Sequence, residues 1–116
     1  MENPVYEKSF EFAVRIVNLY KYLTAEKKEY VMSKQLLRCG TSIGANVAEA
    51  QKGQSFADFI TKMCIASKEA SETAYWLRLL NRTQYINQEQ FSSLWRDVDE
   101  LISLLTAICK TSMNKQ

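Results

Sequence analysis

Histidine is absent from the 116-residue chain, which also has only three glycines and one proline. Without histidine, Ser-His-Asp and Cys-His catalysis are excluded, and only enzymes that work with carboxylates or lysine stay open. So few turn-forming residues cannot supply the many hairpins of a sheet protein. We therefore expect an all-α fold in a single domain, residues 1–116, without catalytic residues.

Long apolar runs are missing as well. No segment approaches the roughly 20 apolar residues that span a bilayer, and the opening MENPVYEKSFEF lacks the layout of a signal peptide. We expect a cytoplasmic protein with no membrane partner.

Cysteine is sparse and its spacing is uninformative. Cys39, Cys64 and Cys109 are odd in number, form no CxxC pair, and stand among apolar residues at helical spacing. This pattern predicts three buried free thiols, in keeping with the cytoplasm. Three cysteines without histidine are a poor zinc set, so we expect no metal and no cofactor.

What the chain does have is helical periodicity. Apolar residues recur at steps of three and four in four segments, which predict helices over about residues 4–23, 25–51, 56–81 and 88–111. Helices of this length with short connections lie antiparallel to their neighbours, as in an up-down-up-down four-helix bundle. The expected core positions are Phe12, Ile16, Leu19, Leu23, Met32, Leu36, Cys39, Ile43, Val47, Ala50, Phe56, Phe59, Met63, Ala66, Ala70, Thr73, Leu77, Leu80, Phe91, Leu94, Val98, Leu101, Leu105 and Ile108.

Polar residues mark the ends of these segments. Asn3 can cap the first helix, Gly53 suits a left-handed position after the second, and the tail from residue 111 to 116 is expected to fray. Capping pairs open the last two helices, Ser55 with Asp58 and Asn87 with Gln90.

Two of the glycines fall in RCGTSIGANVAEA, which reads either as a phosphate loop or as a small-sided helix. A phosphate loop needs a lysine and a hydroxyl residue after its second glycine, and a preceding strand, and both are missing. In a helix, each glycine costs about 1 kcal/mol relative to alanine. Gly40, Gly44 and Ala48 then form a smooth stripe, which predicts a close contact with another helix.

A polar stripe runs beside the small residues. Antiparallel packing places Arg38 opposite Glu72. The acids facing this arginine allow either a general acid–base site or a buried ionic network that fixes helix pairing, and the lack of a nucleophile or metal set favours the network. The stripe comprises Arg38, Ser42, Asn46 and Glu49, with Glu69 and Glu72 facing it.

These same residues carry a family resemblance. The combination of R-x-x-x-S-I-x-x-N-x-x-E with E-x-x-E-T-x-Y-W-L, inside QLLRCGTSIGANVAEA and FADFITKMCIASKEASETAYWLRLL, resembles the four-helix-bundle proteins encoded in intervening sequences of bacterial 23S rRNA genes. The resemblance covers nearly the whole chain. It implies a homopentameric ring without known catalysis and with nucleic acid as partner. The related accessory protein of diversity-generating retroelements is strongly basic and binds a reverse transcriptase and nucleic acid, which implies a reverse transcriptase-like partner.

Charge is where the chain departs from that relative. Lys and Arg total 15 against 13 acidic residues, which gives a net charge of +2. A charge this small does not by itself indicate a protein that binds nucleic acid. An up-down bundle nevertheless gathers basic residues at one end, diluted by Glu26, Glu29 and Glu89, and a ring would repeat that end around its axis. The expected nucleic-acid contacts are Lys21, Lys27, Lys28, Lys34, Arg78 and Arg82. Tyr22, Tyr30 and Tyr85 lie near this end, either capping the core or stacking on bases.

Extra apolar stripes on the first and last helices predict a contact between subunits. They comprise Phe10, Val14 and Val17 on one helix and Trp95, Ile102 and Cys109 on the other. Two functions therefore stand, an oligomeric accessory protein that binds RNA weakly and with little sequence preference, and a protein-interaction scaffold of a mobile element that touches no nucleic acid. A carboxylate-based enzyme is a distant third.

Overall fold

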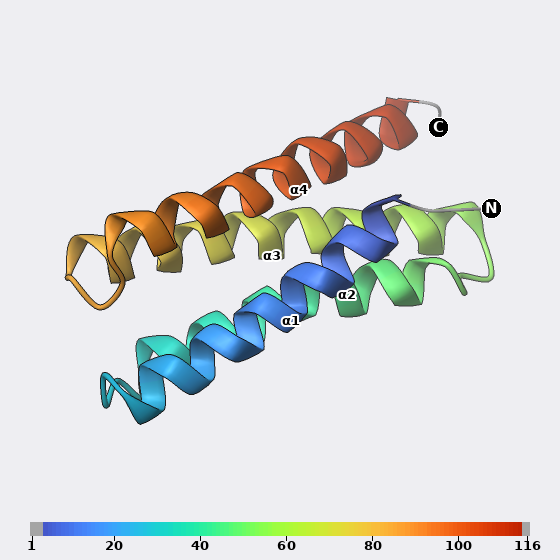
Figure 1. Cartoon of the computed structure of the whole chain (residues 1–116). Coiled ribbons are helices and arrows are strands. Elements are labelled where there is room, and N and C mark those ends of the chain that lie inside the picture. Colours follow the sequence, from blue (N-terminus) through green and yellow to red (C-terminus); the bar gives the residue numbers. More distant parts are fainter. Residues whose placement is uncertain (1–3, 115–116) are drawn as a thin grey trace.

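The protein consists of four long helices, and each helix packs against the next one along the chain. The computed structural model describes residues 4–114, with side chains described through Thr111. Within that range the chain is all-α, with α1 (Pro4–Ala25), α2 (Met32–Ala50), α3 (Phe56–Arg82) and α4 (Gln88–Asn114). Successive helices run in opposite directions along a body of 46 × 24 × 20 Å (Figure 1). The expected all-α architecture with four helices is confirmed.

The core follows the predicted periodicity closely. All four core positions expected on α1 and five of the six expected on α2 are buried. Phe56 is the clear exception because it is 50% exposed at the first position of α3, where it stacks on Phe59. The largest fully buried side chains are Phe12, Ile16, Leu23, Leu36, Ile43, Val47, Met63, Leu77, Leu80, Ile86, Leu101 and Leu105.

The glycines of α2 lie against α1, as the small-residue stripe predicts. A Cβ added at Gly40 would lie 2.8 Å from Cγ2 of Ile16, and one at Gly44 would lie 3.1 Å from the backbone oxygen of Ser9. A methyl group at either position would require its neighbour to move, the side chain of Ile16 at Gly40 and the backbone of Ser9 at Gly44. Close packing of α1 on α2 therefore explains glycine at these positions in spite of its low helix propensity.

The second helix starts later than predicted, at Met32 rather than Ala25. Lys28 has a φ of 56°, which breaks the helical path, and the backbone N–H of Glu29 donates to the carbonyl of Leu23 at 3.0 Å. Glu29 then turns inward, and its carboxylate accepts hydrogen bonds from the first backbone N–H groups of α2. Residues 26–31 are therefore a connection and not a helical turn.

Glycine is not used for a left-handed backbone at the next connection. Gly53 was expected there, but no described glycine has a positive φ. Its added Cβ would lie 3.2 Å from Cβ of Asp58, so close packing accounts for the glycine. The left-handed position instead closes α3, at Gln84 with a φ of 71°.

Both predicted capping pairs are confirmed. The hydroxyl of Ser55 accepts from the N–H of Asp58 at 3.1 Å, and Asn87 and Gln90 exchange two bonds of 2.8 Å. Asn3, the proposed first cap, lies outside the described residues. Residues 111–114 continue α4 where fraying was expected, and residues 115–116 lie outside the described range.

The cysteine prediction is wrong for two of the three residues. Cys64 of α3 and Cys109 of α4 form a disulfide with a Cα–Cα distance of 5.2 Å, and both are only half-buried. Cys39 is the buried free thiol that was predicted. Since disulfides persist mainly in oxidising compartments, the cysteines no longer support the expected cytoplasmic location. Within the described chain, no helix has the length and apolar character to cross a membrane.

Candidate functional site

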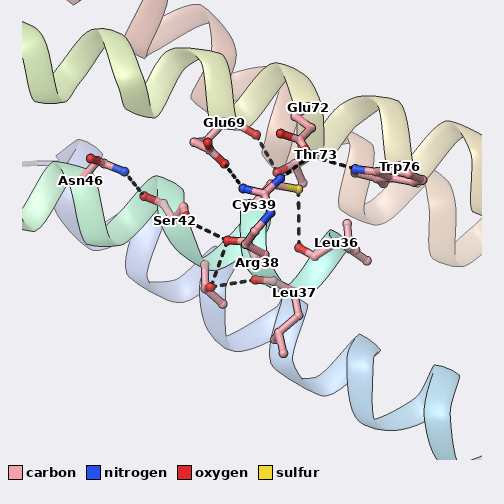
Figure 2. Close-up of polar contacts among 11 residues, drawn as sticks. Leu36, Leu37, Arg38, Cys39, Ser42, Asn46, Glu69, Glu72, Thr73 and Trp76 are labelled. Carbon is pink, nitrogen blue, oxygen red and sulfur yellow. Dashed lines mark hydrogen bonds and ion pairs between the residues drawn. The ribbon is translucent and has the colours of Figure 1, made fainter. Parts of the chain in front are cut away.

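The polar stripe of α2 meets the acids of α3 as predicted. Arg38 contacts both carboxylates, through Nη1 to Oε2 of Glu69 at 3.3 Å and through Nη2 to Oε2 of Glu72. The indole Nε1 of Trp76 also donates to Oε2 of Glu72, at 3.1 Å. Figure 2 shows this chain of contacts running from Arg38 through Glu72 to Trp76.

This network lies at the surface, which corrects the expectation that it is buried. The side chain of Arg38 is 49% exposed, and those of Glu69 and Glu72 are 20% and 37% exposed. The hydrogen bond from Arg38, followed by that from Trp76, lowers the pKa of Glu72 below its usual value. A carboxylate held ionised beside an arginine is a poor general acid, which counts against the acid–base alternative.

The rest of the stripe does not converge on the acids. The hydroxyl of Ser42 donates to the carbonyl of Arg38 at 2.7 Å, and the amide of Asn46 donates to the carbonyl of Ser42 at 2.8 Å. Glu49 pairs instead with Lys62 of α3, at 2.9 Å. Among the described residues there is no group of three His, Cys, Asp or Glu side chains that could hold a metal ion.

Cys39 is buried beneath this network, and its thiol has low reactivity. Burial raises the pKa of its thiol to about 11, so the thiolate is scarce near neutral pH. The thiol donates to the carbonyl of Leu36 at 3.7 Å. Its role in the structure is therefore that of a small core residue.

The second candidate site is the basic end of the bundle, defined by Lys21, Lys27, Lys28, Lys34, Arg78 and Arg82. These residues lie where α1 ends, α2 begins and α3 ends, at the left of Figure 1. All six are exposed, and none makes an ion pair with any carboxylate in the described part of the chain. Lys27 lies over the ring of Tyr22, 6.0 Å from its centroid.

One of the acids expected to dilute the basic end is withdrawn from the surface. Glu29 is only 8% exposed because its carboxylate faces the backbone of α2. Glu26 and Glu89 are exposed, as expected. The solvent-facing surface of this end is therefore more basic than the composition of its segments indicates.

Two hollows open at the basic end. One, of about 320 Å³, lies between the two inter-helix connections at this end and includes Tyr22, Lys27, Asn81 and Tyr85 in its lining. The other, of about 420 Å³, lies between the end of α3 and the start of α4. Tyr22 and Tyr85 are half-buried, whereas Tyr30 is 58% exposed and lines neither hollow.

A set of charged contacts between α1 and α4 was not predicted from the sequence. Lys8 pairs with Glu100 at 2.9 Å, and Arg15 pairs with Asp97 at 2.5 Å while also donating to Ser93. Basic residues seven apart on one helix and polar residues four and three apart on the other are the signal that was available. These bonds cross the least extensive of the four helix–helix contacts.

The apolar stripes predicted for α1 and α4 are only partly free. On α1, Phe10 is 58% exposed and Val14 41% exposed, and Val17 is half-buried. On α4, Trp95 and Ile102 are half-buried against the core, and Cys109 is bonded to α3. On α4 the expected stripe is therefore less exposed than on α1, and the subunit contact stays a prediction.

Comparison with known proteins agrees with the architecture. The model of a family described as 23S rRNA-intervening sequence protein matches residues 1–107. A crystal structure of a protein with unknown function from the S23 ribosomal protein family of Bacteroides thetaiotaomicron is similar, with 62% identity and a TM-score of 0.89. That match covers 91% of this chain and 98% of the other. A comparison with curated proteins gives no match.

Proposed function

Since the chain belongs to the family of 23S rRNA-intervening sequence proteins, we propose that it is a non-enzymatic accessory protein that binds RNA through its basic end. Binding is weak and has little sequence preference. The working form is a homo-oligomer, a pentameric ring in the arrangement that the family resemblance implies.

One observation carries this proposal. Six exposed lysine and arginine side chains gather at one end of the bundle without carboxylate partners among the described residues. A cation that is not paired with a carboxylate is available to phosphate, and each phosphate it neutralises releases counterions. Contacts of this kind read the backbone and not the bases, which is why little sequence preference is expected.

Assembly strengthens the argument from charge. A subunit with a net charge of +2 attracts nucleic acid only weakly as a whole. Closed rotational symmetry repeats the basic end once per subunit on the same face of the ring. The repeated lysines and arginines then act on one RNA strand together.

The chemistry of the polar network supports a non-enzymatic role. Glu69 and Glu72 are engaged with Arg38, and the hydroxyl of Ser42 donates to a backbone carbonyl without a base beside it. A nucleophile requires an adjacent base or a lowered pKa, and Ser42 and Cys39 have neither.

The alternative is a protein-interaction scaffold of a mobile element, with a reverse transcriptase-like protein as one partner. The observation in its favour is the exposed apolar surface of α1, where Phe10 and Val14 face solvent. Exposed apolar groups clustered on one helix are typical of protein contacts. This surface serves equally as the contact between subunits in the first proposal.

Salt dependence of RNA binding tests the proposal. We expect binding of a single-stranded RNA to weaken at least tenfold between about 50 and 200 mM salt, since roughly three phosphates per ring are neutralised. Lys27→Glu combined with Lys28→Glu should weaken binding further at low salt. The matched control is Lys52→Glu combined with Lys68→Glu, which makes the same change in charge at exposed positions outside the basic end.

Two results would count against RNA binding at this end. One is absence of binding at low salt, which would leave the scaffold as the better account. The other is an equal effect of the two double variants, which would mean that net charge alone and not the basic end controls binding.

A further inference from the structure

The hollow between α3 and α4 is lined by aromatic as well as basic side chains. Its volume is about 420 Å³, and its lining comprises Tyr75, Arg78, Leu79, Asn81, Arg82 and Phe91. We call it the aromatic groove. It joins two aromatic rings and two guanidinium groups, and no acidic residue contributes to its lining.

We propose that the aromatic groove binds a nucleotide unit of single-stranded RNA, with a base stacked on Tyr75 and the adjoining phosphates on Arg78 and Arg82. This inference rests on the proposed function and names a contact site within it. It assigns base stacking to Tyr75, where the sequence pointed to Tyr22, Tyr30 and Tyr85.

The ring of Tyr75 is exposed to solvent and supported by a neighbouring ring, which suits it for stacking on a base. Its side chain is 57% exposed, and its ring meets Trp76 edge-on with centroids 5.1 Å apart and an interplanar angle of 78°. Trp76 is itself held by its hydrogen bond to Glu72, which Arg38 contacts from α2. Because the supporting ring is fixed, stacking on Tyr75 requires little additional ordering of the protein.

The arginines lie on the same side of α3 as Tyr75. Positions 75, 78 and 82 are three and four residues apart, so their side chains project from one helical face. Both arginines are exposed and make no ion pair in the described part of the chain. A planar guanidinium binds phosphate oxygens in a bidentate manner, which suits a backbone phosphate beside a stacked base.

Phe91 contributes the second aromatic ring of the lining. It lies in the first turn of α4, is half-buried against the core, and packs on Trp95 with centroids 5.3 Å apart. A lining that combines aromatic rings with guanidinium groups favours a base with its phosphates over an acidic peptide, whose side chains would pair with the arginines alone.

The groove is also connected to the rest of the basic end. Asn81 lines both the aromatic groove and the neighbouring hollow that contains Tyr22 and Lys27. A strand with one base in the groove can therefore continue across the lysines of the connection between α1 and α2. Duplex RNA cannot do so, because its bases are already stacked on one another.

The test measures binding of a fluorescein-labelled oligouridylate to the intact oligomer at low salt. We expect Tyr75→Leu to weaken binding at least about fivefold and Tyr75→Phe to stay close to the native protein, since phenylalanine keeps the stacking face. Arg78→Gln combined with Arg82→Gln should weaken binding and lower its salt dependence by about one phosphate contact per arginine. Phe56→Leu and Arg96→Gln are matched controls at exposed positions outside the groove and outside the basic end, and they should have little effect.

The outcomes separate this inference from the proposed function. If the native protein binds no oligouridylate, the proposed function fails and the inference fails with it. If the native protein binds and Tyr75→Leu binds equally well, the inference is overturned while RNA binding at the basic end stands.

Three further results would also overturn it. Displacement of the RNA by oligoglutamate, sensitive to the arginine variants but not to Tyr75→Leu, would identify an acidic-peptide surface. Dissociation of the oligomer by Tyr75→Leu in light scattering would identify the groove as a contact between subunits. Oligouridylate annealed to oligoadenylate should bind less tightly than the single strand, and equal affinity would contradict base stacking.

Discussion

At the scale of single residues, Arg38 stabilises the contact between α2 and α3 from the surface. Its side chain is 49% exposed, so water and salt screen its attraction to Glu69 and Glu72. We expect Arg38→Ala to lower the free energy of unfolding by at most about 1 kcal/mol in urea titrations. A loss of about 3 kcal/mol or more would contradict this, because it is the cost of leaving buried acids without a partner.

Glu29 should make stability depend on pH. Burial alone would raise its pKa, but hydrogen bonds from the N–H groups of Ser33, Met32 and Val31 outweigh burial and place the pKa below the usual 4.5. A lowered pKa in the folded state stabilises the protein above the unfolded-state pKa, and this contribution is lost as pH falls through the folded-state pKa.

We therefore expect Glu29→Gln to lower the free energy of unfolding by about 0.5–2 kcal/mol near neutral pH. The difference from the native protein should shrink in denaturant titrations below pH 4.5, the usual pKa. Glu26→Gln, an exposed position in the same connection, is the control and should change little. A difference for Glu29→Gln that stays constant into acid would contradict the capping role.

At the scale of elements, the disulfide ties α3 to α4 across 45 residues of sequence. Cross-linking a loop of this length restricts the unfolded chain, so Cys64→Ala combined with Cys109→Ala should lower the free energy of unfolding by about 2–4 kcal/mol. Denaturant titration measures this loss. Cys39 lies outside the loop, so the two substitutions leave its free thiol unchanged.

Thiol titration of the denatured protein checks the pairing directly. With one disulfide among three cysteines, a single thiol should react without reductant and all three should react after reduction. Three reactive thiols without reductant would mean that Cys64 and Cys109 are not paired. The doubly substituted variant should show the same stability with and without reductant.

The helices themselves were largely predictable, because burying an apolar stripe imposes its period on the sequence. The connection at residues 26–31 was not predictable, because glutamate is a good helix former and Glu29 therefore fits a helical segment. Only the structure shows that its carboxylate accepts hydrogen bonds from the backbone of α2. The disulfide between Cys64 and Cys109 could not be predicted from the sequence either. A half-buried cysteine that faces another helix has the same spacing as a core residue, and only the packing of α3 on α4 brings the two sulfurs together.

The candidate site was predictable in its partners but not in its environment. Antiparallel packing correctly placed Arg38 opposite Glu72, because it depends only on helix order and spacing. The exposure of the pair depends on how far the helices splay around it, which spacing does not encode. The aromatic groove was also missed, since Tyr75 and Phe91 line one hollow only because the connection between α3 and α4 brings the two helix ends together.

At the scale of the whole molecule, the exposed side of α1 should hold subunits together. Phe10 and Val14 are 58% and 41% exposed and lie one turn apart on the same face of α1, so they form a small apolar patch. We expect light scattering to report a multiple of the 13.4 kDa chain mass at micromolar concentration. Phe10→Glu should shift the protein toward the monomer, because a carboxylate in an apolar contact is strongly unfavourable.

Phe56→Glu is the matched control for that experiment. Phe56 is 50% exposed, similar to Phe10, but belongs to the first turn of α3 and not to α1. It should leave the oligomer intact. A monomeric native protein, or equal dissociation by both variants, would contradict a subunit contact on α1.

The central claim is that RNA meets the bundle at its basic end. Photo-crosslinking of a 4-thiouridine oligonucleotide to the native protein, followed by mass spectrometry of the peptides, tests it most directly. We predict crosslinks in the connection at residues 26–31 and at the end of α3, with Tyr75 among the modified residues. Crosslinks concentrated at the opposite end of the bundle, around residues 51–55, would contradict the account.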